Sequence, residues 1–230
     1  HEVAKELLSR PEAVGLGGEK REVAILMVDI RGFTALAESL SPEIVINLLN
    51  RYFFHVIEVI HSHRGIIVDF FGDGILVFFD PLEGPVEPEV RRAVQCALGI
   101  REVMEEVNRE MNGKDLPELR IGIGIHAGEV VVGNIGSESR AKYGIVGSAV
   151  NLTARIQSQA GEGDILVSET VYYRLGGALR VSDSFQAELK GVQERVQLYK
   201  VESFHEAGEQ GNPSPRELDS DPFHAFDLLT

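Results

Sequence analysis

The sequence is poor in cysteine and tryptophan, and it has no long uninterrupted hydrophobic run. Among its 230 residues there is one cysteine, Cys96, and no tryptophan. A single cysteine excludes an internal disulfide and is typical of a reducing compartment. Because Cys96 lies in the apolar pattern of an expected helix, we expect it to be a core residue. No segment reaches the roughly 18 apolar residues of a membrane span, and no signal peptide is recognisable. We expect a domain that faces the cytosol and makes no direct membrane contact, whether or not the full-length protein is anchored.

Basic residues are also scarce relative to acidic ones. The chain has 22 Lys and Arg against 36 Asp and Glu, a formal net charge of −14. This charge argues against nucleic acid as a partner, and it also repels small anionic ligands. A phosphate site in this chain would therefore have to depend on a metal ion and on local hydrogen-bond donors. Hydrophobic residues make up 43% of the chain, enough for one globular domain with a core.

Composition divides the chain into three parts. Residues 1–20 contain Pro11 and a glycine cluster and are expected to be a linker. Because the chain begins at His1 rather than Met, we expect it to be a fragment with a regulatory domain upstream. Residues 21–203 form the predicted domain, and the acidic, proline-bearing residues 204–230 are expected to be a disordered tail.

The order of apolar patterns within residues 21–203 predicts an α+β fold. A strand is expected at 22–29 and a helix after the Ser41-Pro42 start signal. The remaining predictions are a hairpin (66–70 and 75–79), a helix (90–111), two strands (119–127 and 130–135), a helix (148–159), a strand (164–168) and two strands within 178–201. This order is typical of the ferredoxin-like split βαβ (βαββαβ) sandwich with an appended C-terminal α/β element.

Two short stretches each place an aspartate at the end of an apolar run beside glycine. Asp29 closes the first expected strand, and Asp73 lies in the turn of the expected hairpin. In the split βαβ arrangement these strands are neighbours, so both carboxylates can face one cation. Carboxylates with few other protein ligands suit Mg²⁺, which completes its octahedron with phosphate oxygens and water. A lone acidic residue at a strand end is most often a solvated turn residue, and it is the pairing that indicates a metal site.

A third pattern lies on the helix expected at 148–159. Asn151 and Arg155 are four residues apart and so share one helix face. With the two aspartate motifs, these residues make the chain resemble the class III nucleotidyl cyclase catalytic domain, the family of adenylyl and guanylyl cyclases. The resemblance covers about residues 21–201 and implies an antiparallel-rich sheet with helices covering one face.

The resemblance implies a role for each motif in converting a purine nucleoside triphosphate to a cyclic monophosphate for intracellular signalling. Asp29 and Asp73, with the backbone carbonyl of Ile30, would bind two Mg²⁺ or Mn²⁺ ions. After Gly32, the N–H groups of Phe33 and Thr34 at a helix start would bind the β- and γ-phosphates.

The second set of residues implies a dimer. Asn151 would orient the ribose, Arg155 would meet charge at the α-phosphate, and Lys190 would contact the terminal phosphates. In the family these residues act across a subunit interface from the aspartates. Since this chain has both sets, the resemblance implies a homodimer with shared sites.

The resemblance assigns base choice to Asp69 and Gly144. Adenylyl cyclases typically have Lys and Asp or Thr there, whereas guanylyl cyclases typically have Glu and Cys or another small residue. An ionised carboxylate only accepts hydrogen bonds, which suits guanine's N1–H and N2–H donors and opposes adenine's N1 acceptor. Asp69 therefore favours GTP, but Asp is one methylene shorter than Glu and Gly144 has no side chain. ATP and pyrimidine nucleotides remain alternatives.

Three other functions compete with cyclisation. A catalytically silent cyclase homologue could bind nucleotide or transmit a signal as a dimer. A diguanylate cyclase shares the sheet-helix layout, but residues 71–74 lack that family's following acidic and aromatic residues. The last alternative is an interaction domain with no active site.

Overall fold

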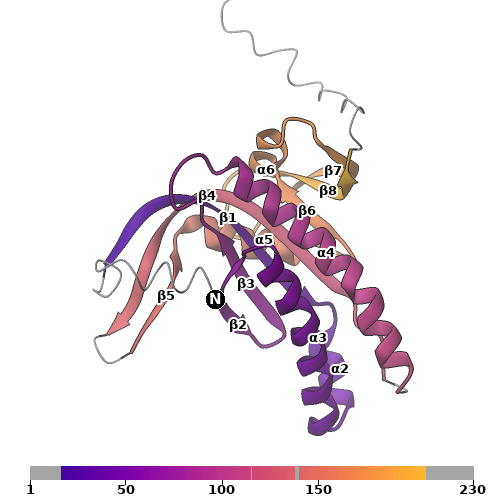
Figure 1. The fold of residues 1–230 in the computed structure, drawn as a ribbon. Helices are drawn as coiled ribbons and strands as arrows, with labels where there is room; N and C mark the ends of the chain where they lie inside the picture. The colour runs from indigo at the N-terminus through magenta and orange to yellow at the C-terminus, as the bar shows by residue number, and fades with distance from the viewer. Residues whose placement is uncertain (1–16, 115, 138–139, 206–230) are drawn as a thin grey trace, which may run out of the picture.

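The computed structural model describes residues 17–114, 116–137 and 140–205, and these form one eight-stranded sheet with helices packed against it (Figure 1). In chain order the elements are β1 (Gly17–Ile30), α2 (Phe33–Ser39), α3 (Pro42–Ser62), β2 (Ile66–Phe71), β3 (Gly74–Phe79), α4 (Glu87–Asn112), β4 (Ile121–Ser137), β5 (Arg140–Val146), α5 (Ser148–Gln159), β6 (Ile165–Ser168), α6 (Glu169–Arg174), β7 (Leu179–Ala187) and β8 (Val196–Phe204). None of the helices in these ranges has the length and apolarity to cross a membrane.

The strand order confirms the predicted fold class. The sheet runs β2-β3-β1-β4-β6-β8-β7, with β5 paired to β4. The first four strands are antiparallel neighbours, as the split βαβ arrangement requires. The appended part begins with β6, which pairs parallel to β4, and ends with the antiparallel pair β7 and β8.

The two faces of β1 pack against different helices. Ala24, Leu26 and Val28 are fully buried in the core that α3 and α4 cover, and these helices lie side by side in Figure 1. Val23 and Ile25 point the other way and pack with Ala149 of α5. The expectation that helices cover one face is therefore wrong for α5. The central strands are apolar on both faces, so the sheet can bury a helix on each side.

Helix α5 lies very close to β4. An added Cβ at Gly124 would come within 2.4 Å of the backbone nitrogen of Gln157, so only glycine fits between this strand and the helix. The buried side-chain amide of Gln157 donates a hydrogen bond to the carbonyl of Gly122. These contacts fix the helix that carries Asn151 and Arg155 relative to the end of β1.

Strand boundaries differ from the prediction where pairing is long-range. Strand β1 starts at Gly17, within the stretch expected to be a linker, because it pairs with β4 from Gly17 opposite Asn134 to Ile30 opposite Ile121. The same pairing makes β4 one continuous strand rather than two. Strand β5 and helix α6 were not predicted. The rest of the predicted linker, residues 1–16, and the predicted tail from residue 206 lie outside the described residues.

Candidate active site

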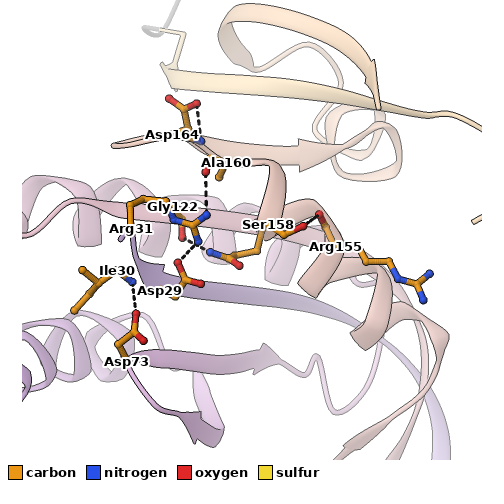
Figure 2. Close-up of polar contacts among 11 residues, drawn as sticks. Asp29, Ile30, Arg31, Asp73, Gly122, Arg155, Ser158, Ala160 and Asp164 are labelled. Carbon is orange, nitrogen blue, oxygen red and sulfur yellow. Dashed lines mark hydrogen bonds and ion pairs between the residues drawn. The ribbon is translucent and has the colours of Figure 1, made fainter. Parts of the chain in front are cut away.

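The two aspartates lie together where β1 and the β2–β3 hairpin end at the same edge of the sheet (Figure 2). Val28 pairs with Ile75, which brings Asp29 beside Gly74, where an added Cβ would be 3.6 Å from the Asp29 Cβ. The Oδ2 oxygen of Asp73 accepts a hydrogen bond of 2.8 Å from the backbone N–H of Ile30. The hairpin turn is thereby fastened to the end of β1, with its carboxylate at the strand terminus.

Arg31 adds a cation to this acidic corner. Its guanidinium forms an ion pair with Oδ1 of Asp29, and its Nη1 donates a 3.1 Å hydrogen bond to the carbonyl of Ala160 (Figure 2). Burial lowers the pKa of Arg31, an effect that the charge of Asp73 opposes. An arginine stays protonated despite such a shift, so Arg31 carries a fixed positive charge beside Asp29.

The donor set of this corner suits a hard divalent cation. Asp29 and Asp73 contribute carboxylate oxygens, and the Ile30 backbone lies between them. Across the described residues no three His, Cys, Asp or Glu side chains gather around a common point. Oxygen ligands of this kind fit Mg²⁺ or Mn²⁺ better than the softer metals that thiolates and imidazoles select.

A helix start follows directly after Asp29. Gly32 has a left-handed backbone (φ 69°) that turns the chain from β1 into α2, and its carbonyl accepts the Leu36 N–H at 3.1 Å. Phe33 and Thr34 are the first two helical residues, whose N–H groups have no partner within a helix. Of the expected phosphate-binding residues, Gly32, Phe33 and Thr34 thus follow the aspartate-bearing end of β1 directly.

The expected base-selecting residues lie on strands β2 and β5. Asp69 forms an ion pair of 2.8 Å with Lys142, and this hydrogen bond is the main reason that the pKa of Asp69 is lowered. Gly144 is buried, and an added Cβ would be 3.2 Å from a methyl of Val68. Lys142 was not predicted from the sequence. Its only signal was a basic residue two positions before Gly144, on the same strand face.

Asn151 and Arg155 form a second group on α5. Asn151 is exposed, and the guanidinium of Arg155 lies against the turn that contains Lys190 and Gly191, where an added Cβ at Gly191 would be 3.3 Å from Nη2. In Figure 2 the Arg155 side chain points away from Asp29 and Asp73. The structure therefore brings Arg155 and the Lys190 turn together, and separates them from the aspartates of the same chain.

The histidine on β4 makes a structural contact. His126 is buried and its Nδ1 is 2.8 Å from the Ser168 hydroxyl, which also accepts the Val171 N–H at the start of α6. Burial lowers the pKa of His126 to about 4, so its imidazole is neutral near pH 7.

Fold and site together define an α+β domain with paired carboxylates where the central strands end and an Asn/Arg helix on the sheet face opposite to α3 and α4. Residues 18–203 match the model of the adenylate and guanylate cyclase catalytic domain, and the chain belongs to this family. It is 31% identical over 207 residues to adenylate cyclase 1 of Rhizobium meliloti (strain 1021), covering 86% of this chain and 31% of that protein. It is 30% identical to adenylate cyclase of Anabaena cylindrica, covering 80% and 37%. The chain thus spans about a third of the length of these relatives.

Solved structures of cyclases share the fold. The guanylyl cyclase Cya2 superposes with a TM-score of 0.79 at 42% identity, covering 85% of this chain and 99% of that one. The adenylyl cyclase CyaB from P. aeruginosa superposes with a TM-score of 0.78 at 31% identity, covering 83% and 98%. Relatives named for either purine are thus similar to this chain, so overall similarity does not choose the base.

Proposed function

We propose that this domain converts a purine nucleoside triphosphate into its 3′,5′-cyclic monophosphate and pyrophosphate. The observation that carries the proposal is the placement of Asp73, whose carboxylate is hydrogen-bonded to the Ile30 N–H beside Asp29. This corner is followed at once by the α2 helix start. Such a combination suits a triphosphate whose charge is shared between divalent cations and backbone donors.

In the proposed reaction, the ribose 3′-oxygen bonds to the α-phosphorus and loses its proton, while the bond from that phosphorus to the departing pyrophosphate breaks. Asp29, Asp73 and the Ile30 carbonyl would hold two Mg²⁺ or Mn²⁺ ions. Ions in such a pair supply charge stabilisation for the attacking and leaving oxygens. Because both reacting groups belong to one molecule, the protein's task is to fix geometry and stabilise charge.

The α5 residues would complete the site of a second copy. Arg155 points away from its own chain's aspartates, so in a homodimer it can serve the partner's α-phosphate while Asn151 orients the ribose. Lys190, in the turn against Arg155, would contact the terminal phosphates. Exposed apolar side chains on the hairpins offer a surface for this association: Phe70, Phe71, Val131, Ile135 and Val146.

The Asp69–Lys142 pair supports GTP as the preferred substrate. The ion pair keeps Asp69 ionised, so its oxygens can accept from guanine N1–H and N2–H, while Lys142 offers a donor to guanine O6. ATP stays the second candidate, because the same lysine could donate to adenine N1. We also propose that regions outside this domain regulate it. Its expected location is the cytosol, where nucleoside triphosphates are abundant.

Product identification tests the proposal. Purified protein is incubated with ATP, GTP, CTP or UTP under Mg²⁺ or Mn²⁺, and nucleotides are separated by chromatography. We expect cyclic GMP as the main product. Cyclic AMP in its place would reverse the base assignment. No cyclic product from any nucleotide would favour the silent homologue.

A further inference from the structure

The two aspartates of the proposed metal site are not equivalent. Asp73 accepts a hydrogen bond from a neutral backbone donor, and its charge acts on Arg31 without a direct ion pair. Asp29 is paired with the guanidinium of Arg31, and the exposed fractions of the two side chains are 33% and 20%. One of the two expected metal ligands therefore already has a cation, built into the same motif two residues later.

Several contacts confine the Arg31 guanidinium to this place. Besides its bond to the Ala160 carbonyl at the end of α5, it lies against β4, where an added Cβ at Gly122 would be 2.9 Å from Nε. Nε is buried without a hydrogen-bond partner, and the Arg31 backbone N–H donates to the Arg120 carbonyl at 2.6 Å. Glycine at position 122 is required for this position of the arginine, because any side chain would displace it.

We propose that Arg31 is a built-in counter-cation that competes with divalent metal for Asp29 until the triphosphate arrives. Its fixed charge repels a metal that approaches Asp29, and the metal must displace its ion pair. A bound triphosphate adds several negative charges to the same corner and offsets that repulsion. In this scheme Arg31 acts through Asp29 and makes the affinity of the site for metal depend on bound nucleotide. The inference rests on the proposed function, which supplies the metal site.

The test is a titration of the whole chain with Mn²⁺ in the absence of nucleotide. The electron paramagnetic resonance signal of free Mn²⁺ measures how much of the metal is bound. We expect Arg31→Gln to bind Mn²⁺ about tenfold more tightly than wild type, and Arg31→Lys to stay within about threefold of it. Arg21→Gln is the matched control. Arg21 lies near the other end of β1, has the same 20% exposed fraction and pairs with Asp80. This control should leave Mn²⁺ affinity within about twofold of wild type.

The triphosphate arm uses 3′-deoxy-GTP and 3′-deoxy-ATP, which lack the attacking hydroxyl and cannot cyclise. With either bound, the difference between wild type and Arg31→Gln should shrink to about threefold or less, because the ligand's charge now dominates. If Arg31→Gln does not fold, Gly122→Ala should act in the same direction by displacing the guanidinium.

Two failures are distinguishable. If Asp73→Asn weakens Mn²⁺ binding but Arg31→Gln binds no more tightly than wild type, the counter-cation role is wrong and the proposed metal site stands. If Asp73→Asn has no effect on Mn²⁺ binding, the metal site itself is wrong, and with it both this inference and the proposed function.

Discussion

The two groups of candidate active-site residues are built in opposite ways. The aspartate group is assembled by contacts within one chain: Asp73 is bonded to the Ile30 N–H, and Asp29 to Arg31. The α5 group presents Asn151 to solvent and turns Arg155 away from those aspartates. The first group is formed by contacts within one chain, whereas the second lies at the surface, where a second chain can approach it.

This difference has a physical cause in the fold. The aspartate group lies where hydrogen-bonded strands end side by side, so strand register places it. The α5 group lies on a helix that packs against Val23 and Ile25, the face of β1 onto which Asp29 also alternates, and Arg155 contacts the turn at Gly191 instead. Because Arg155 points away from Asp29 and Asp73, this arrangement supports the proposed completion of each site by a second copy.

The largest expected effect comes from breaking the aspartate group. Asp73→Ala should lower the rate of cyclisation by about 10³-fold or more, because it removes a proposed metal ligand and the acceptor for the Ile30 N–H. Size-exclusion chromatography should show an unchanged dimer. Asp183→Ala, the same change at an exposed site on β7, should retain activity. Wild-type turnover by the Asp73 variant would refute the metal assignment.

Mixing two inactive variants tests whether the groups work across chains. Asp73→Ala and Arg155→Ala should each be inactive, but their heterodimer contains one intact site. An equimolar mixture should recover about 25% of wild-type activity, since half the dimers are mixed and each has one of two sites. The control mixture, Asp73→Ala with Asp29→Ala, damages the same group in both chains and should stay inactive. Equal activity of the two mixtures would rule out shared sites.

A smaller effect is expected from His126, which is buried on β4. Its pKa of about 4 in the folded state lies below the ordinary 6.5, so below pH 6.5 protons bind preferentially to the unfolded chain. Stability is therefore full above pH 6.5 and falls as pH decreases, by about 3 kcal/mol at pH 4. Urea unfolding from pH 7 to pH 4 measures this loss. His126→Asn should show a shallower pH dependence, and an identical slope would exclude His126 as the cause.

Local signals predicted much of this molecule, and long-range pairing accounts for most of what they missed. Helix α5 spans residues 148–159 as predicted, because its apolar periodicity is contained in those residues. The hairpin around Asp73 was also found, since its glycines mark the turn. The continuous β4 was missed, because its length is set by β1, about a hundred residues earlier in the sequence.

The site residues follow the same division. Asp29, Asp73, Asn151 and Arg155 are predicted from short motifs. The contacts of Arg31 and Lys142 are not, because each depends on strands or helices distant in sequence. The alternating glycines of β4 were a usable signal for α5 packing. Glycine on every second position of an otherwise apolar strand indicates a close backbone on that face.

The smallest expected effect concerns base choice and asks whether the Asp69–Lys142 pair reads the base. Asp69→Ala should lower kcat/KM for GTP by about tenfold while changing that for ATP by less than about threefold, because guanine loses the acceptor for its N1–H and N2–H donors. Lys142→Ala should lower kcat/KM for both purine nucleotides, since its ammonium can donate to guanine O6 or to adenine N1. Competition assays with both nucleotides measure the ratio directly. A variant of Asp69 that loses ATP rather than GTP would show that the carboxylate accepts from the adenine amino group, and that Lys142 then occupies the adenine N1 position.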